Sequence, residues 1–178
     1  PARPEPDQEP RQRGPWQVRD PSYVARAMPG KLEVRCRSCG QRNRIPLTRA
    51  GAGGRCGKCK TSLPLPATPV EVERAEDLHT ILAQAKVPVL VDFWASWCGP
   101  CRMVAPEIAK VAQQHTHEWL VVKANTEVDP RLPAEHKIQS IPMMAVFAHG
   151  RELARSAGAR PAPAIESFVR SSLAGGGG

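Results

Sequence analysis

The strongest constraint on the fold is the segment Trp97-Cys98-Gly99-Pro100-Cys101, which places two thiols one helical turn apart directly after an apolar run. That run, at 87–94, is rich in β-branched and aromatic residues, as expected of a buried strand, yet it contains the carboxylate Asp92. Pro100 is tolerated in the first turn of a helix, and residues 103–114 continue with helical spacing. The segment predicts a strand that delivers a dithiol to a helix start, a position suited to reversible disulfide chemistry.

Cys98 is predicted to be the attacking nucleophile of this pair. Free backbone N–H groups and the positive end of the helix dipole stabilise a thiolate, and such surroundings lower a cysteine pKa from ~8.5 to between ~3.5 and ~7.5. Cys101 lies on the same helix face and is predicted to resolve the mixed disulfide on Cys98. Gly99 frees the turn and Pro100 restricts it. The alternative is a pair of inert buried thiols.

The ten residues from Asp92 to Cys101 closely resemble the active-site segment of the thioredoxin family. Further positions that match this family in order within residues 69–174 are Pro106, Lys123, Ile141, Pro142, Phe147, Gly150 and Gly158. The resemblance implies an α/β thioredoxin fold, a mixed central sheet with helices on both faces. It also implies a protein-disulfide reductase that carries a redox-active disulfide and no bound organic cofactor. Its partners would be client proteins with disulfides and an NADPH-dependent thioredoxin reductase.

The resemblance also implies roles for single residues. Asp92 corresponds to the buried carboxylate that takes the proton from Cys101, and Lys123 corresponds to its charge partner. The alternative for Asp92 is a satisfied core polar group without a proton-transfer task. The implied substrate-contacting residues are Trp97, Gly99, Pro100, Ile141, the cis-proline Pro142 and Gly158. Met143 departs from the family, which usually has a small polar residue after this proline.

Two further CxxC pairs lie upstream, separated by residues 40–55. They are Cys36 with Cys39 and Cys56 with Cys59. Two thiolates from each tight turn complete the tetrahedral shell of a structural Zn²⁺, and Gly40 and Gly57 suit the turns. Residues 31–66 have few large apolar side chains, so a module this small needs a staple such as a metal. Structural disulfides or a second redox pair are the alternatives.

A zinc ribbon ahead of such a domain is itself similar to the bacterial thioredoxin 2 type, and the stretch from Arg55 to Lys60 resembles the second knuckle of that subfamily. The zinc module is expected to be structural or, because thiolate ligands are oxidisable, redox-sensing. Zn²⁺ is therefore the one metal expected, with all four upstream cysteines as its ligands.

The composition divides the chain into four parts. Residues 1–30 are rich in proline and charge and are expected to form a disordered tail, followed by the ribbon at 31–66. A stiff proline-rich linker leads to the thioredoxin domain at 69–174, and residues 175–178 form a flexible glycine tail. Helices are expected at 75–84, 98–115, 131–136 and 162–173, and strands at 87–94, 120–125, 143–148 and 153–157. His115 and His117 are expected at the surface.

Charge is distributed unevenly along the chain. Residues 1–70 contain fourteen Lys and Arg against five Asp and Glu, whereas residues 71–178 contain eleven against twelve. A basic ribbon that recognises a nucleic acid or an acidic partner, with the second domain as a scaffold, is the alternative class of function. The ribbon has no aromatic residue on which bases would stack, so nucleic acid is not the expected partner.

The cysteine content and the apolar runs bear on the compartment. Residues 1–10 have no signal-peptide pattern, and no run approaches the ~18 apolar residues of a membrane span. In a reducing cell, six cysteines are better explained as four metal ligands and one dithiol than as three bridges. A cytoplasmic protein without membrane contact is therefore the expectation. A monomer is the expected oligomeric state.

Overall fold

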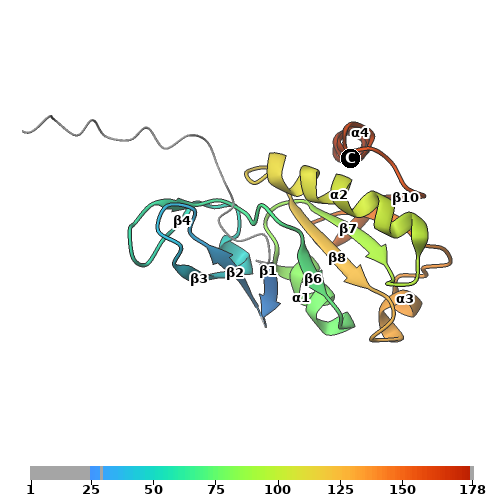
Figure 1. Cartoon of the computed structure of the whole chain (residues 1–178), viewed down its shortest axis with the longest axis horizontal. Coiled ribbons are helices and arrows are strands. Elements are labelled where there is room, and N and C mark those ends of the chain that lie inside the picture. The colour runs from blue at the N-terminus through green and yellow to red at the C-terminus, as the bar shows by residue number, and fades with distance from the viewer. Residues whose placement is uncertain (1–24, 29, 177–178) are drawn as a thin grey trace, which may run out of the picture.

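The structure is a computed structural model that describes residues 25–28 and 30–176 of the 178-residue chain (Figure 1). Its strands are β1 (Ala25–Met28), β2 (Lys31–Arg35), β3 (Arg42–Pro46), β4 (Gly54–Arg55), β5 (Ser62–Leu63), β6 (Val70–Val72), β7 (Val89–Trp94), β8 (Leu120–Asn125), β9 (Met143–Ala148) and β10 (Arg151–Ala157). Its helices are the 3₁₀ turn η1 (Leu47–Arg49), α1 (Ala75–Gln84), α2 (Gly99–Gln114), α3 (Arg131–Glu135) and α4 (Ala162–Gly175).

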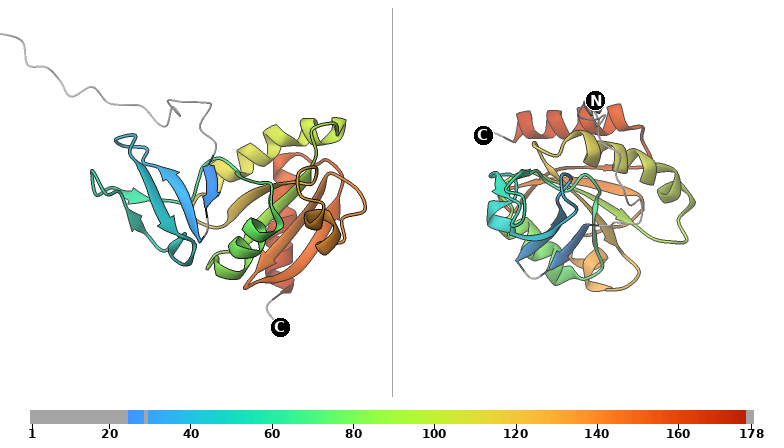
Figure 2. Two further views of the ribbon diagram at one scale, coloured as in Figure 1. Left: turned by 90° about the horizontal axis from the view of Figure 1, so that it is seen from below. Right: turned by 60° about the vertical axis from the view of Figure 1, so that its left-hand side comes forward.

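A mixed eight-stranded sheet in the order β10-β9-β7-β8-β6-β1-β2-β3 runs through the molecule, and β4 and β5 form a separate hairpin. Helices α2 and α4 cover one face of the catalytic half of this sheet, while α1 and α3 lie on the other (Figures 1 and 2). The predicted fold class, a mixed sheet between two layers of helices preceded by a small cysteine-rich module, is confirmed.

Buried side chains alternate along the central strands and so make two cores. In β7, Val89, Val91 and Phe93 pack with α1, whereas Leu90 packs with α2 and α4. The period of two is that of a strand covered on both faces. Asp92 shares the parity of Leu90, so it lies on the face that α2 covers.

Most predicted element bounds agree with the structure. The helix expected at 75–84 and the strands expected at 120–125 and 143–148 coincide with α1, β8 and β9. Strand β10 begins at Arg151, earlier than expected, because it pairs with the whole of β9 from the turn onward. Strand β6 was not predicted, since three residues after a proline-rich stretch carry too little periodicity.

The tail expected at 1–30 falls largely outside the described residues, but Ala25–Met28 form β1. Strand β1 pairs in parallel with β6 and antiparallel with β2, so it joins the ribbon to the catalytic sheet. At the other end of the chain, Gly175 is the last residue of α4, and residues 177–178 lie outside the described part. The expected 1–30 tail therefore includes a strand, and the boundary expected between 174 and 175 cuts the last turn of α4.

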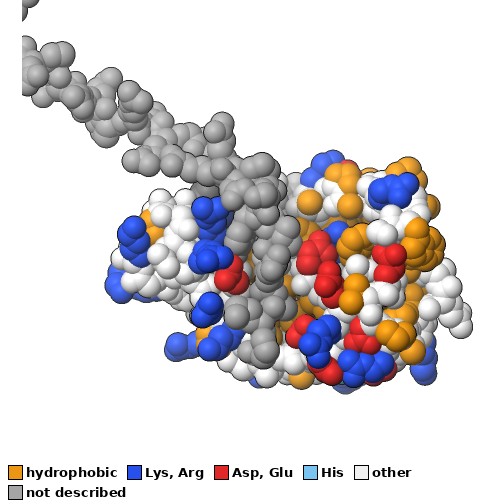
Figure 3. Space-filling model, turned by 60° about the horizontal axis from the view of Figure 1, so that its bottom comes forward, with side chains coloured by type: hydrophobic (Ala, Val, Ile, Leu, Met, Phe, Trp, Pro, Cys, Tyr) orange, Lys and Arg blue, Asp and Glu red, His pale blue; other side chains and the backbone are white. Residues whose placement is uncertain are grey.

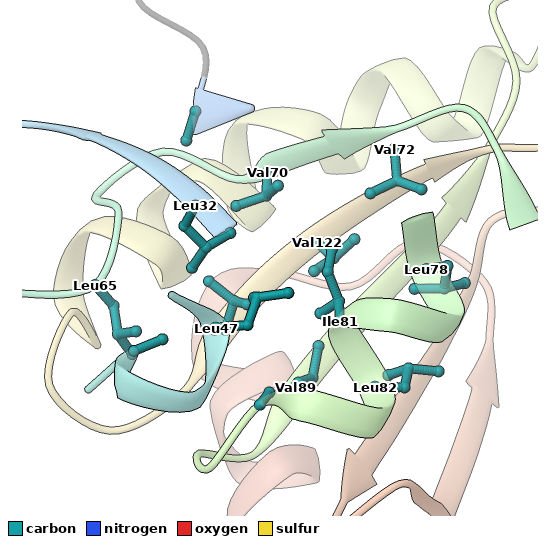
Figure 4. Packing of buried hydrophobic residues seen from close by; sticks show 14 of the residues in the cluster. Leu32, Leu47, Leu65, Val70, Val72, Leu78, Ile81, Leu82, Val89 and Val122 are labelled. Atoms are coloured by element: carbon teal, nitrogen blue, oxygen red, sulfur yellow. The ribbon is translucent and has the colours of Figure 1, made fainter. Parts of the chain in front are cut away.

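The ribbon and the catalytic half share one hydrophobic core. Leu32 of β2, Leu47 of η1 and Leu65 of the linker pack in the same cluster as Val70 and Ile81, and Figure 4 shows these side chains pointing toward one another. The linker is fixed as well as stiff, since the Leu65 N–H donates to the Thr116 carbonyl oxygen at 2.8 Å. The ribbon is thus packed against the larger domain as a continuation of its sheet.

His115 is buried, contrary to the expected surface position at a helix end. Its ring stacks on Trp119 at a centroid distance of 4.0 Å and lies 3.3 Å from carboxylate oxygens of both Glu118 and Glu166. These contacts tie the end of α2 to α4. Within the described ranges, none of the helices combines the length and the apolar character that crossing a bilayer requires.

Candidate active site and metal centre

Cys98 and Cys101 form a disulfide at the start of α2, with an S–S distance of 2.09 Å and a Cα–Cα distance of 5.2 Å. Cys98 is the N-cap residue of α2, and its sulfur accepts a hydrogen bond from the Cys101 N–H at 3.2 Å. Pro100 occupies the first turn, where its missing N–H costs no helical hydrogen bond. The predicted strand-to-helix junction thus places the first sulfur at the positive end of the helix dipole.

The loop before the disulfide is held by a residue that the sequence did not indicate. Glu127, which follows β8, accepts hydrogen bonds from the backbone N–H of Ser96 at 2.5 Å and from its hydroxyl at 3.1 Å. Trp97 is the next residue and is 70% exposed. A fixed loop therefore presents a large apolar side chain to solvent beside the sulfurs.

A second loop faces the disulfide from the start of β9. Ile141 packs against Cys98 and Cys101, and the Ile141–Pro142 peptide bond is cis. The Gly158 N–H donates to the Pro142 carbonyl oxygen at 2.9 Å, and Gly158 has a φ of 91°, a region that favours glycine. The structure therefore brings three of the implied substrate-contacting residues, Ile141, Pro142 and Gly158, together at the redox centre. Met143 follows them and is half-buried.

Asp92 lies fully buried in β7 on the face covered by α2, whose buried stripe begins at Cys101. Neither of its carboxylate oxygens has a hydrogen-bond partner in the described part of the chain. Desolvation by burial raises its pKa to about 7, although the positive charge of Lys123 acts in the opposite direction. A carboxyl group that titrates near neutral pH is suited to accept and return a proton.

Lys123 has a different direct partner from the one expected. It is the register neighbour of Asp92, but its ammonium group lies 3.1 Å from Glu71 Oε1 and 4.0 Å above the Trp94 ring. Lys123 thus acts on Asp92 through space without a hydrogen bond to it. Glu71 was missed, although its position in Val70-Glu71-Val72, a carboxylate within an apolar run, is the signal that indicated Asp92.

The four upstream cysteines come together as one cluster, although none of them is disulfide-bonded. All four sulfurs lie within 4.8 Å of one another, with Cys36 and Cys59 at 3.5 Å and Cys39 and Cys56 at 3.6 Å. Zn–S bonds of ~2.3 Å in a tetrahedron require sulfur–sulfur edges of about 3.8 Å. The cluster therefore has the size of a Zn²⁺ site.

The electrostatics of the cluster favour a bound cation. Hydrogen bonding between Cys59 and the side chain and backbone of Thr61 lowers the pKa of Cys59 to about 6. A backbone hydrogen bond at Gln41 lowers the pKa of Cys39, but burial and the three neighbouring cysteines together outweigh it and raise that pKa to about 11. Four thiolates do not ionise together without a compensating charge, and a divalent metal ion provides one.

The two knuckles have the same backbone hydrogen bonds. Gly40 N–H donates to the Cys36 carbonyl oxygen at 2.9 Å, and Lys60 N–H donates to that of Cys56 at 3.0 Å. The residue after each CxxC has a positive φ, 76° for Gly40 and 62° for Lys60. The turn role expected of Gly57 thus belongs to Lys60, while the Gly57 N–H donates to the Asn43 side-chain oxygen at 2.9 Å.

The disulfide and the cysteine cluster lie beyond opposite ends of the strands of the sheet. Strand β1 is parallel to β6, β6 to β8 and β8 to β7, and β2 is antiparallel to all of them. Cys36 follows the end of β2, whereas Cys98 follows the end of β7. The cysteine cluster therefore does not adjoin the disulfide.

Comparison with known proteins assigns both parts. The family model described as Thioredoxin matches residues 69–171. The chain belongs to the thioredoxin family. The family model described as Thioredoxin 2, N-terminal, matches residues 35–61, which include all four ribbon cysteines. The predicted membership of the thioredoxin 2 type, with its zinc ribbon, is confirmed.

Individual thioredoxins support the same assignment. The chain is 39% identical to Thioredoxin C-3 of Corynebacterium nephridii over 124 residues, which is 70% of this chain and 83% of that protein. It is 40% identical over 107 residues to a thioredoxin of Synechocystis, covering 60% of this chain and 98% of the relative. The solved structure of a mutant thioredoxin from Halobacterium salinarum superposes with a TM-score of 0.55 at 26% identity, over 61% of this chain and 93% of the other. This thioredoxin is a protein-disulfide oxidoreductase of the reductase type.

Proposed function

We propose that Cys98 attacks the client disulfide and that Cys101 resolves the product. The Cys98 thiolate forms a bond to one client sulfur, and the other client sulfur leaves as a thiolate that takes up a proton. The Cys101 thiolate then attacks the Cys98 sulfur, which releases the second client thiol and forms the Cys98–Cys101 disulfide. Two electrons pass from the dithiol to the client. The hydrogen bond from the Cys101 N–H to the Cys98 sulfur is the observation that carries this assignment.

In this proposal Asp92 takes the proton from Cys101 during resolution. Its buried position on the α2 face and its pKa of about 7 support the role, because a base near the working pH accepts and returns protons efficiently. Lys123 is a positioning residue, since its charge acts on Asp92 across the strand pair.

The client segment is proposed to lie along the surface that surrounds the disulfide. Trp97 provides exposed apolar area, and the backbone of Ile141 beside Pro142 pairs with an extended client chain. Gly99 and Pro100 leave the sulfur edge without bulky side chains, and Gly158 supports the loop of Pro142. The side chain of Met143 beside this loop makes the contact apolar where the family usually has a small polar residue.

We propose that the four ribbon cysteines bind one structural Zn²⁺. The dimensions of the cluster and the charge that four thiolates require support this site. The metal would join the two knuckles and stabilise the folded ribbon, which has few buried apolar residues of its own. A redox-sensing role is the second candidate, because oxidation of the thiolates would release the ion.

The proposed partners follow from this cycle. A disulfide left on the enzyme needs an external reductant, and an NADPH-dependent thioredoxin reductase supplies the electrons by analogy with the family. All proposed active residues come from one chain, so a monomer suffices. Metal-bound thiolates together with a dithiol fit the reducing cytoplasm, which we propose as the compartment.

Reduction of a protein disulfide driven by dithiothreitol tests the assignment. We expect Cys98→Ser to abolish turnover, and Cys101→Ser to accumulate a mixed disulfide between Cys98 and the client that mass spectrometry detects. Equal turnover of Cys98→Ser and the wild type would contradict the roles proposed here.

Zinc quantification on the same samples tests the metal centre, with one ion per chain expected in both variants. Peroxide treatment separates the two roles of the ribbon. Release of zinc in parallel with a change in activity supports sensing, whereas retention of zinc while activity changes supports a purely structural ion.

A further inference from the structure

Three charged side chains form one row across neighbouring strands. Glu71 of β6 is the register partner of Lys123 of β8, which is the register partner of Asp92 of β7. Val70 and Val72 flank Glu71 and pack with the α1 core, so Glu71 lies on the opposite face, with Asp92 and Lys123. The row therefore lies on the face of α2, the helix that carries the dithiol.

Lys123 sits between two carboxylates but contacts only one of them. Its ammonium group is 3.1 Å from Glu71 Oε1, while both Asp92 oxygens are without a hydrogen bond from any described residue. The Trp94 ring, 4.0 Å from the same ammonium group, stabilises this orientation through a cation–π contact. The Glu71 side chain is 34% exposed, so its charge keeps part of its hydration, which the buried Asp92 lacks.

We infer that Glu71 is a positioning residue of the redox centre: by binding Lys123 it keeps the lysine from pairing with Asp92 and so leaves Asp92 an unpaired carboxyl group that can carry a proton. The inference deepens the proposed function and rests on it for its catalytic consequence.

The charges that face Asp92 account for this effect. Strand β8 contributes Lys123, β6 contributes Glu71 and β9 contributes the uncharged Met144 as register partner, while the helix that covers this face, α2, begins at the dithiol. Lys123 lowers the pKa of Asp92 and Glu71 raises it. A direct ion pair with Lys123 would lower that pKa by roughly 1 to 3 units and leave a weak base.

Glu71 also lies where the ribbon meets the catalytic sheet. Strand β6 is hydrogen-bonded to β8 on one side and to β1 on the other, and the backbone of Arg26 in β1 is the register partner of Glu71. Without β1, β6 would be the edge strand of the catalytic sheet. The strand that carries Glu71 is therefore held in register by β8 and by β1, the strand that joins the ribbon to the catalytic sheet.

Titration of the Asp92 carboxyl carbon by NMR in the oxidised full-length protein tests the inference without reference to activity. We expect Glu71→Gln to lower the Asp92 midpoint by roughly 0.5 to 1 pH unit, because a negative charge two strands away is lost and Lys123 is freed. Glu73→Gln is the matched control, since Glu73 is an exposed carboxylate next to the same strand. The Asp92 midpoint in this control should equal that of the wild type. An unchanged midpoint in Glu71→Gln overturns the inference.

A double-mutant cycle with Lys123→Met tests whether Glu71 acts through the lysine. In the Lys123→Met background, Glu71→Gln should shift the midpoint by less than half as much as in the wild type. Equal shifts in both backgrounds overturn the positioning role. Glu71→Asp provides the rescue, because it keeps the charge and should return the midpoint toward the wild-type value.

The pH profile of mixed-disulfide resolution separates this inference from the proposed function. If Glu71→Gln lowers both the Asp92 midpoint and the pH midpoint of resolution, both are supported. If the Asp92 midpoint falls and the resolution profile does not follow, the positioning role of Glu71 is supported and the proposed proton transfer by Asp92 is overturned.

Discussion

Cys98 and Cys101 are bonded to each other, whereas close sulfur contacts in the ribbon run from one CxxC pair to the other. In the catalytic half, the two cysteines open a long helix with a proline in its first turn. In the ribbon, each pair sits in a knuckle closed by a backbone hydrogen bond to its first cysteine, and the Gly57 N–H of the second knuckle donates to the side-chain oxygen of Asn43 beside the first. Identical spacing thus leads to a redox dithiol in one region and a metal-sized cluster in the other.

The difference teaches that the surroundings of a CxxC pair decide its chemistry. The catalytic pair has a helix N-terminus and a buried carboxylate on the same face of the sheet. Each ribbon pair is surrounded by the cysteines of the other pair. The ribbon surface is rich in Lys and Arg, which Figure 3 shows on the left of the view.

Removing one sulfur of the cluster should have the largest effect. Cys56 is fully buried, and Cys56→Ser should abolish stoichiometric zinc, for which apparent binding free energies of ~10 to 16 kcal/mol are typical of small zinc modules. Because Leu32 and Leu47 share a core with α1, the thermal midpoint of the whole chain should fall as well. Elemental analysis and a thermal melt check this result.

Ser38→Ala is the control for this change, since Ser38 is exposed within the first knuckle and should leave zinc content unaltered. One zinc per chain in Cys56→Ser would show that the cluster does not need all four thiolates.

Asp92→Asn should show how the buried carboxylate near the catalytic pair affects stability and mixed-disulfide resolution. The folded-state pKa of about 7 exceeds the ordinary 3.8, so ionisation opposes folding, and the free energy of unfolding should fall by about 4 kcal/mol as pH rises from 4 to 8. Asp92→Asn should lose this dependence, be more stable than the wild type at pH 8 and resolve mixed disulfides roughly 10²-fold more slowly. Denaturant unfolding across this pH range provides the measurement. If the unfolding free energies of Asp92→Asn and the wild type changed equally with pH, the prediction would be contradicted.

Lys58→Pro converts the second knuckle to the residues Cys-Gly-Pro-Cys of the active site. If surroundings decide the chemistry, this variant in a Cys98→Ser background should show no reductase turnover. The backbone N–H groups of Cys59 and Lys58 both lower the pKa of Cys56, and proline removes the second of them, so zinc affinity should fall roughly 10-fold. Lys58→Ala keeps that N–H and serves as the control, and turnover by the Pro variant would show that sequence alone makes the dithiol.

Lys60→Gly should have the smallest effect and sharpen the comparison between the two knuckles. Lys60 has a φ of 62° where the first knuckle has Gly40, so glycine relieves strain while the hydrogen bond to Cys56 stays. The free energy of unfolding should rise by up to about 1 kcal/mol, measured by denaturant titration of the zinc-loaded protein. Gly40→Ala should act in the opposite direction, and a destabilised Lys60→Gly would mean that the side chain contributes more than the strain costs.

Much of the catalytic half was predictable because its signals are local. The bounds of α1, β8 and β9 follow from periodicity, and the redox pair follows from a strand, a proline and two cysteines within a short segment. Strands β1 and β6 were not predictable in this way, since each is short and is stabilised by hydrogen bonds to neighbours on both sides. The strand β1 within the expected 1–30 tail went unnoticed for the same reason.

The available sulfurs, the positions of the long helices and strands, and the carboxylate that interrupts an apolar strand can all be read from the order of residues. That the ribbon extends the catalytic sheet and that Lys123 binds Glu71 became visible in the folded chain. The physical reason is that these contacts depend on the register between strands far apart in the chain. Register is set by backbone hydrogen bonds and shared burial, and neither can be read from the residues of one segment.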